Sequence, residues 1–395
     1  MKKGKIIHIS QSAYNTLQTL NIKTESDDFI TWSWSKRTAY NMLKYTDEYE
    51  VECWRPEPNI KKPIVREIKG VTFKVFPCFW LKGTGIISRH MFGTLKQEKM
   101  NYNIILDLHN VHNIQSYFLS LFFKDIPIIM HHHGSYQPIV AFRNHKDPIY
   151  LFLYLFDKIS LKYIDYFSVI SKVEKDYLID KYDADVILEQ GRIDFNKWKP
   201  IDKNIAKEKL NIPSKRKVII YVGKYFQLKG VDVVLKTYKE LKKVYNVELI
   251  LIGGSLNDPL YNKVMSSGAK VYHSISNDEL VHYYSAADVF LFPSFNDLFV
   301  KYGGFGTAPI EALACNIPIV SSQLIHFRGK EKEAEKIGKI PKNEDDVVKC
   351  VSEIFNNPSK YDDCREIAKK YYDVKRITTD LIEIYNRLFE EYYNK

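Results

Sequence analysis

Two glycine-containing segments in the second half of the sequence carry residues suited to binding an anion. In the first, YVGKYFQLKG, Gly223 ends an apolar run and is followed by Lys224 and Lys229. Two ammonium groups beside a tight turn can neutralise a diphosphate, whose negative charges need fixed positive partners. Two solvated lysines without a special role are the alternative, because the whole chain is rich in lysine.

The second segment, KYGGFGTAPIEALACNIPIVSS (301–322), places three glycines directly before an expected helix. Glycines let a ligand approach the backbone closely, and the N–H groups of Gly306, Thr307 and Ala308 are expected to donate to phosphate oxygens. Glu311, expected in the first turn of this helix, is suited to accept both hydroxyls of a ribose. An acid placed there by the helix dipole alone is the alternative.

Histidines gather in two stretches of the first half. IIMHHHGSY ends an apolar run with His131, His132 and His133, and strand alternation puts the first and third on one face. Three consecutive residues on a strand rarely surround a zinc ion, so no metal site is expected there. In LDLHNVHN, His109 and His112 are either lining residues of a binding site or structural histidines.

No metal and no organic cofactor are expected. The DAD triplet at 183–185 lies at the end of an expected helix and far in sequence from the segment 221–230 with Lys224 and Lys229, which we call the lysine loop. We interpret the triplet as a solvated turn. The five cysteines are scattered without a C-x-x-C pair, which is typical of reduced thiols in a cytosolic protein.

The formal net charge of +10 is spread thinly along the chain. Such an excess suits anionic small molecules or a membrane surface as well as nucleic acid. Nucleic acid is not expected as a partner, because the sequence has no zinc-finger, RNA-recognition or helix-turn-helix signature. The N-terminal apolar run is too short for a secretion signal, and Ile149–Phe156 is too short to span a bilayer. We expect a cytoplasmic protein, soluble or peripheral at the inner face of the membrane.

The segment 76–99 mixes apolar, aromatic and basic residues. It is interpreted either as a surface resting on an anionic bilayer or as a helix packed in a core with one wet face.

Short apolar runs alternate with amphipathic segments almost throughout, a pattern that predicts parallel sheets covered by helices. The alternation is interrupted near residue 200 by a polar, lysine-rich stretch and then resumes. We call the segment 303–306, with its three glycines, the glycine turn, and we expect the helix that follows it over Pro309–Ala314. The fold class is therefore α/β, with two Rossmann-like doubly wound domains facing a cleft. We expect one domain over 1–200, a second over 201–370, and a C-terminal helix over 371–395 that packs toward the first domain.

The order of these motifs resembles that of the retaining GT-B glycosyltransferases of family four, the glycosyl transferases group 1. The lysine loop is similar to the family's G-R-x-x-x-x-K-G loop, and YHSISNDELVHYYSAADVFLFPS (272–294) is similar to its D-E-L-x-x-x-Y-x-x-A-D-V run. The stretch ending at Glu311 is similar to its E-x7-E motif. The similarity is best over 217–325 and weaker in the first half.

The resemblance implies that residues 1–200 form the acceptor-side domain and residues 201–370 the nucleotide-sugar-binding domain. It also implies roles for individual residues. Lys224 and Lys229 would hold the diphosphate of the donor, and Glu311 would hold its ribose. Backbone around His273 and Ser274 would meet the base. Gly306 to Ala308 would line the phosphate and the sugar, and His133 is the histidine expected to hydrogen-bond the donor sugar.

The sequence departs from the family pattern at two places. Gly303 stands where the first Glu of E-x7-E is expected; Asp297 substitutes for that acid, or the acid is simply lost. The loop ITWSWSKRTAY before the first helix of the chain lacks the family's paired glycines.

The resemblance implies a metal-independent hexosyltransferase that moves a sugar from a UDP- or GDP-sugar to a glycan or lipid-linked acceptor with retention. The alternative is an inactive nucleotide-sugar-binding module that acts as a partner of another transferase.

Overall fold

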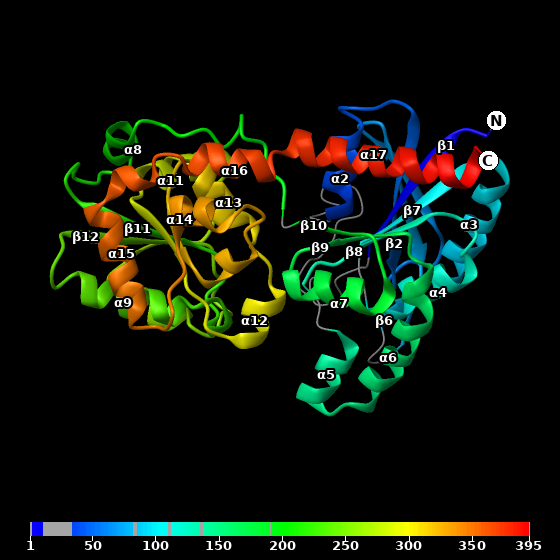
Figure 1. Ribbon diagram of the computed structural model, residues 1–395, viewed down its shortest axis with the longest axis horizontal. Coiled ribbons are helices and arrows are strands. Elements are labelled where there is room, and N and C mark those ends of the chain that lie inside the picture. Colours follow the sequence, from blue (N-terminus) through cyan, green and yellow to red (C-terminus); the bar gives the residue numbers. More distant parts are fainter. Residues whose placement is uncertain are drawn as a thin grey trace. The chain divides into compact units, whose positions relative to one another are not determined.

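The computed structural model describes residues 2–10, 34–81, 85–109, 112–134, 137–189 and 191–394. The chain divides into two compact units, each an α/β domain (Figure 1). The first comprises Met1–Val169, Glu174–Ile187 and Lys375–Lys395, and the second comprises Ile170–Val173 and Leu188–Val374.

The described part of the first unit contains an eight-stranded sheet with the order β10-β9-β8-β7-β1-β2-β4-β3. The central pairs from β9 to β4 are parallel, and β3 is antiparallel to β4. The strands are β1 (Gly4–Ser10), β2 (Tyr49–Glu57), β3 (Ile64–Ile68), β4 (Val71–Pro77), β7 (Asn103–His109), β8 (Ile128–His131), β9 (Tyr166–Val169) and β10 (Val186–Leu188).

Helices connect and cover these strands. They are α2 (Trp34–Met42), α3 (Arg89–Asn101), α4 (Ile114–Phe122), α5 (Pro138–His145), α6 (Pro148–Ser160), η2 (Leu161–Tyr163), α7 (Lys172–Tyr182) and α17 (Val374–Tyr393). The segment 76–99 is not one helix: it contains the antiparallel pair β5 (Phe79–Leu81) and β6 (Gly85–Ile87), followed by α3.

The C-terminal helix α17 is part of the first unit's core. Leu381 and Tyr385 are buried with strand residues such as Ile6, and Asn386 Oδ1 accepts a 2.6 Å hydrogen bond from Tyr49. The last twenty residues of the chain therefore complete a domain that is built mainly from the first half of the sequence.

The second unit contains a six-stranded, wholly parallel sheet with the order β13-β12-β11-β14-β15-β16. Its strands are β11 (Lys217–Val222), β12 (Val247–Ile252), β13 (Lys270–Tyr272), β14 (Val289–Phe292), β15 (Ile319–Ser321) and β16 (Gly338–Lys339). Its helices are α8 (Lys203–Lys209), η3 (Gln227–Lys229), α9 (Val231–Leu241), α10 (Tyr261–Met265), α11 (Asn277–Ala286), α12 (Asp297–Tyr302), α13 (Thr307–Ala314), η4 (Ser322–His326), α14 (Glu331–Ile337), α15 (Asp346–Asn356), η5 (Pro358–Tyr361) and α16 (Cys364–Tyr372).

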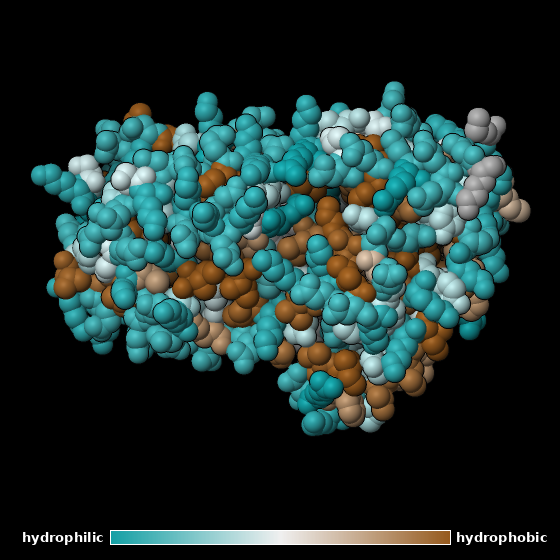
Figure 2. All heavy atoms as spheres, viewed as in Figure 1, coloured by the Kyte–Doolittle hydropathy of each residue, from teal (hydrophilic) through white to brown (hydrophobic). Residues whose placement is uncertain are grey.

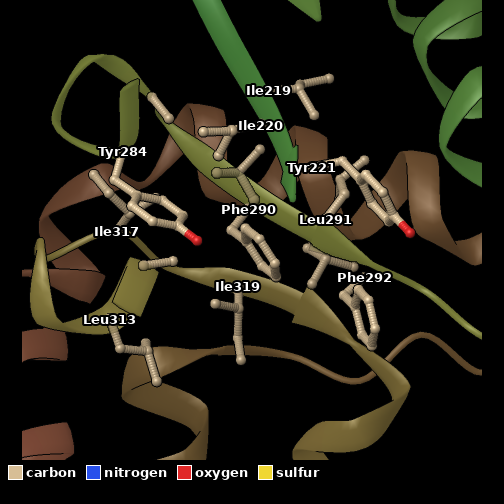
Figure 3. Close-up of a cluster of buried hydrophobic side chains, with 14 of the residues drawn as sticks. Ile219, Ile220, Tyr221, Tyr284, Phe290, Leu291, Phe292, Leu313, Ile317 and Ile319 are labelled. Atoms are coloured by element: carbon tan, nitrogen blue, oxygen red, sulfur yellow. The ribbon is translucent and has the colours of Figure 1, made fainter. Parts of the chain in front are cut away.

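The central strands β11 and β14 are apolar on both faces because helices cover both sides of the sheet. Figure 3 shows Ile220 and Phe290 among the buried side chains of this core, with Tyr284 of α11 and Leu313 of α13 beside them. The order β11-β14 places two strands that are far apart in sequence next to each other. Their carboxyl ends therefore share one edge of the sheet.

A close backbone contact joins the loops that follow these two strands. Gly230, between η3 and α9, has φ +75°, and a Cβ atom built on it would lie 2.3 Å from the carbonyl oxygen of Pro293. Ser294 Oγ also donates a 2.6 Å hydrogen bond to the carbonyl of Leu228. Only glycine permits this conformation and this approach together.

Replacing Gly230 by alanine is expected to lower the unfolding free energy of the second unit by more than the cost of placing alanine in a left-handed conformation, because the new Cβ atom would also clash with Pro293. Gly268 is a matched control, because it has φ +74° but nothing within 4 Å of its built Cβ atom. We expect Gly268→Ala to cost about 1–2 kcal/mol of unfolding free energy, and Gly230→Ala to cost roughly 1–3 kcal/mol more from the clash. Chemical denaturation of the two variants measures the difference; equal losses would contradict the close contact.

Candidate functional site

The residues predicted to bind a nucleotide sugar in the second unit follow three strands of its sheet. The loops after β13, β11 and β14 carry them, and these three strands lie with β12 in a run of four adjacent, parallel strands. Ligands of doubly wound sheets bind at the carboxyl ends of the strands. The fold thus places these residues at the edge where such a ligand is expected.

The lysine loop begins directly after β11. Gly223 has φ +155°, and the Tyr221 hydroxyl donates a 2.7 Å hydrogen bond to the Lys224 carbonyl, so the turn is fixed from the core. The Lys224 side chain is exposed, whereas Lys229 is half-buried at the end of η3. Burial lowers the pKa of Lys229, and the nearby positive charge of Lys224 lowers it further. An anion bound between these two cations would relieve both effects.

A glycine pair after β12, which the sequence analysis missed, supports this loop. A Cβ on Gly253 would lie 2.8 Å from the Gly223 carbonyl oxygen, and one on Gly254 would lie 2.3 Å from the Tyr225 ring. The buried Asp258 accepts a 2.7 Å hydrogen bond from the Tyr225 amide. The signal was available in the sequence, since two consecutive glycines directly after a buried strand indicate close backbone approach.

The glycine turn leads into α13, which begins at Thr307 and not at the expected Pro309. Proline is tolerated there because the first N–H groups of a helix have no intrahelical partner. Gly306, with φ +81°, is the N-cap, so Thr307 and Ala308 are the first two residues of the helix. The N–H groups expected to meet a phosphate therefore lie at a helix N-terminus.

Glu311 consequently lies in the second turn of α13, and its expected place in the first turn was wrong. Its carboxylate is half-buried and accepts a 3.1 Å hydrogen bond from the hydroxyl of Tyr284. Tyr284 is fully buried on α11, and its burial and the neighbouring Glu311 raise its pKa well above the usual value. The phenol therefore stays protonated and orients the carboxylate, an interaction that the sequence did not predict.

The two candidate positions for the first acid are separated by α12. Asp297 is the exposed first residue of this helix, and Gly303 is its C-cap. Six residues of helix place them about 9 Å apart along the helix axis. A Cβ on Gly303 would lie 2.5 Å from the carbonyl oxygen of Phe299, so the position does not accommodate a larger side chain without movement.

His273 and Ser274 follow β13 and are both exposed. The His273 ring stacks on Tyr261 of α10, with centroids 5.4 Å apart and an interplanar angle of 27°. The pair forms an aromatic surface next to the loops after β12 and β11.

In the first unit, His133 belongs to a cluster of imidazoles around one buried carboxylate. Its Nε2 lies 3.3 Å from Nδ1 of His109, and Nε2 of His109 lies 3.0 Å from Oδ1 of Asp107. His131 Nε2 lies 3.0 Å from the same oxygen, and the Tyr385 hydroxyl of α17 donates to Oδ2. As alternation predicts, His131 and His133 share a face of the sheet.

The imidazoles His109 and His133 of this cluster are neutral near pH 7. Burial lowers the pKa of His109 to about 4 and lowers that of His133 well below its usual range. Burial alone would raise the pKa of Asp107, but the surrounding histidines, His131 first, lower it well below its usual value. The cluster thus surrounds one buried carboxylate with imidazole rings and a phenol that donates a hydrogen bond to it. Asp107 and His8 were missed because their neighbours come from separate strands.

His132 and His112 lie together elsewhere, with their rings at 77° and centroids 5.8 Å apart. His112 Nδ1 is 2.8 Å from Asp157 Oδ1, and its Nε2 is 3.4 Å from Glu174 Oε1. Burial opposes the charge of His112, yet these carboxylates raise its pKa to about 10. His112 is therefore an imidazolium held between two buried carboxylates.

Two groups of side chains in the described residues have the composition of a metal site: His8 with Asp107 and His109, and His112 with His132 and Glu174. Part of each group is held by ion pairs, of Asp107 with His109 in the first and of His112 with Glu174 in the second. The acids of the DAD triplet, Asp183 and Asp185, are exposed, as expected for a solvated turn. Residues 30–33 at the start of the ITWSWSKRTAY loop lie outside the described residues. Of the helices described, none has the length and apolar composition needed to cross a bilayer.

Residues 202–371 match the family model described as glycosyl transferases group 1. D-inositol 3-phosphate glycosyltransferase of Salinispora arenicola is 27% identical over 177 residues, which cover 38% of each chain. The chain spans between about a third and a half of the length of the first curated relatives it matches.

Solved structures resemble the whole chain. Sucrose-phosphate synthase of Thermosynechococcus elongatus superimposes with a TM-score of 0.67 at 17% identity, covering 98% of this chain and all of that one. HepE of Anabaena, in complex with UDP and glucose, gives 0.64 at 14% identity, with 98% and 100% covered. These likenesses confirm the GT-B fold of two Rossmann-like domains. Together with the family match over residues 202–371, they confirm the similarity to the glycosyl transferases group 1 that the sequence motifs indicate.

The ion pairs of His112 are expected to make stability depend on pH. A histidine with a raised pKa stabilises the fold fully below about pH 6.5, and this contribution is lost as the pH rises toward about 10. Glu174, whose pKa is lowered to about 2, contributes above about pH 4.5 and loses its contribution as the pH falls. The ion pair of His112 and Glu174 therefore stabilises the first unit most between about pH 4.5 and about pH 6.5.

His112→Gln should accordingly be less stable than the wild type by a few kcal/mol at pH 6, with the difference shrinking as the pH rises. Unfolding free energies from denaturant titrations at several pH values measure it. His145→Gln, at an exposed position of α5, is the control. A difference between wild type and His112→Gln that did not change with pH would contradict the buried imidazolium.

Proposed function

We propose that the protein transfers a sugar from a nucleotide-diphosphate sugar to a glycan or lipid-linked acceptor, with retention at the anomeric carbon and without a metal ion. One observation carries the proposal: the lysine loop, the N-terminus of α13 and the anchored carboxylate of Glu311 follow adjacent elements at one edge of a parallel sheet. A diphosphate joined to a ribose requires this combination of cations, backbone N–H donors and a carboxylate acceptor.

Lys224 and Lys229 would stabilise the charge that grows on the leaving diphosphate. Electrostatic groups that are fixed before the reaction contribute most where charge develops in the transition state. Burial and mutual repulsion already disfavour two charged lysines in the free loop. The lysines and the N-terminus of α13 would thus take the part that a divalent cation has in other transferases.

His133 would contact the donor sugar as a neutral imidazole. Its ring stacks parallel to that of His109, with centroids 5.6 Å apart, and the cluster around Asp107 fixes the orientation of both. A neutral ring can accept a hydrogen bond from a sugar hydroxyl or donate one to it. The acid–base chemistry of a charged histidine is not required for such a contact.

UDP-sugars are the first donors to test, because Anabaena HepE was solved with UDP and with UDP-glucose. A thermal-shift panel of UDP- and GDP-sugars compares the candidates. A ligand at one hundred times its dissociation constant stabilises the protein that binds it by about 2.7 kcal/mol.

A nucleotide-sugar-binding module without transferase activity is the second candidate. It is favoured by Gly303, which stands where an acid is expected and has no room for one. Such a module would bind the nucleotide sugar but neither transfer nor hydrolyse the sugar. Measuring donor binding and donor turnover on the same sample separates the two functions.

Lys229→Ala is expected to lower donor turnover by about 100- to 1,000-fold, because an electrostatic contact to the leaving group is lost. Release of UDP from a UDP-sugar is the measurement. Lys242→Ala, at an exposed position after α9, is the control and should leave turnover unchanged. Turnover of Lys229→Ala close to that of the wild type would exclude the proposed role of this lysine.

The affinity for UDP is expected to fall as the pH rises. Only the protonated Lys229 attracts a diphosphate, and its lowered pKa means that it loses its proton before an ordinary lysine does. In Lys229→Arg the charge persists, so the ratio of the two dissociation constants should grow between about pH 7 and pH 10. Calorimetric titration at matched pH values measures this ratio, and a constant ratio would count against the contact.

A further inference from the structure

Helix α6 (Pro148–Ser160) is apolar on its outer face as well as on its inner face. It contains the run IYLFLYLF, which is too short to span a membrane and has no part in the proposed function. Leu153, Asp157 and Ser160 are buried on the inner side. A helix that is hydrophobic all round is normally covered on all sides.

Four large apolar side chains of α6 are nevertheless exposed: Leu151 by 43%, Phe152 by 44%, Leu155 by 54% and Ile159 by 51%. Leu151, Leu155 and Ile159 follow one another every four residues and Phe152 lies three residues before Leu155, so all four lie along one side of the helix. Phe122 at the end of α4 is 68% exposed and continues this surface through the rings of Phe118 and Phe156. Figure 2 shows hydrophobic residues gathered over the α5–α6 region of the first unit. We call this surface, made by the five exposed side chains, the α6 face.

The helix cannot turn its outer side inward, because its inner side is fixed by polar contacts. Asp157 accepts a 2.8 Å hydrogen bond from the Tyr117 hydroxyl and pairs with the His112 imidazolium. Rotating α6 would take Asp157 away from Tyr117 and from the buried His112 imidazolium, and losing one partner of a buried ion pair is strongly unfavourable. The exposure of the α6 face is therefore a stable property of the unit.

The α6 face is bordered by basic residues. Arg143 and Lys146 lie at the end of α5, and Lys158 and Lys162 lie at the end of α6; all four are exposed. Between residues 138 and 163, which the structure describes throughout, the only exposed acid is Asp147. Within this stretch the exposed charged side chains are thus mostly positive.

Tyrosines lie between the apolar and the basic side chains. Lys158 lies over the ring of Tyr154 with its Nζ 4.7 Å from the centroid, and Lys162 lies over Tyr163 at 5.0 Å. Tyrosine and lysine both have an apolar stem and a polar end, which suits them to the boundary between hydrocarbon and lipid headgroups.

We propose that the α6 face binds the surface of an anionic lipid bilayer, with the apolar side chains among the acyl chains and the four bases against the headgroups. Apolar side chains bordered by cations match this partner in both hydrophobicity and charge. The surface lies on α6, and the segment 76–99 that the sequence suggested is not part of it. The proposal does not rest on the proposed transferase activity.

Flotation of the full-length protein with lipid vesicles tests the proposal. The wild type should float with vesicles of equal parts phosphatidylcholine and phosphatidylglycerol and bind phosphatidylcholine vesicles much more weakly. Leu155→Glu/Ile159→Glu should abolish flotation. Val244→Glu/Leu256→Glu is the matched control, because these residues are 72% and 78% exposed on the second unit; it should float like the wild type.

A second pair of variants tests the charge. Each lysine near an anionic surface contributes about fivefold to binding, so Lys158→Gln/Lys162→Gln should weaken binding to the anionic vesicles at least about tenfold. Circular dichroism melting curves show whether each variant is folded. The charge variants keep the apolar surface intact, and they report on the proposal even if the glutamate pair does not fold.

Two results would overturn the proposal. One is flotation of Leu155→Glu/Ile159→Glu equal to that of the wild type, or no flotation of the wild type at all. The other is a dimer of the wild type in size-exclusion chromatography that the glutamate pair abolishes, without lipid binding, because a second copy would then cover the surface. The thermal shift with UDP reports on the proposed function separately, and it should be the same in the wild type and the α6-face variants.

Discussion

The candidate donor site depends on one close contact, between Gly230 and the carbonyl oxygen of Pro293. It joins the loop after β11 to the loop after β14, and the first loop carries Lys229 while the second leads to the glycine turn. The contact requires the β11-β14 order of the sheet, a left-handed residue at the start of α9, and the absence of a side chain. The hydrogen bond from Ser294 to Leu228 adds to it. If this contact opened, the loop that carries Lys229 and the loop that leads to the N-terminus of α13 would no longer be packed directly against each other.

The charges of the two units are arranged in opposite ways. In the first unit, buried charges are balanced where they lie: Asp107 is surrounded by hydrogen-bonding groups, and His112 lies between two carboxylates. In the second unit, Lys229 is half-buried next to another cation, and Asp258 offsets only part of the effect. Balanced clusters stabilise a domain, whereas a local excess of one sign is kept where a ligand of opposite sign completes it. This contrast is a physical reason to expect an anionic ligand, such as a diphosphate, to bind to the second unit.

The sequence predicted the second unit well, because its strands are short, apolar on both faces and followed directly by the functional loops. It placed the α13 helix two residues late, since Pro309 is an ambiguous start signal inside a first turn. In the first unit it missed the β3–β4 hairpin, whereas the expected C-terminal helix that packs toward the first domain corresponds to α17. The cluster around Asp107 could not be predicted, because it joins strands β1, β7 and β8 to Tyr385 across 278 residues of sequence. Contacts of this range have no local pattern that would reveal them.

The absence of an acid at position 303 is a consequence of the local backbone structure and not only of the replacement of one residue by glycine. The chain forms the additional helix α12 between β14 and the glycine turn, with Asn296 as its N-cap. Gly303 ends that helix, and its hydrogen atom faces the carbonyl of Phe299, where a side chain would clash. Restoring a glutamate at this position would therefore disturb the end of α12 before it could reach a ligand. An acid that acts on the donor sugar would have to come from another element. Asp297 lies about 9 Å from Gly303 along α12, so the start of that helix sets its position and the glycine turn does not. In the proposed transfer, the electrostatic contribution of the second unit would then rest on Lys224, Lys229 and the N-terminus of α13.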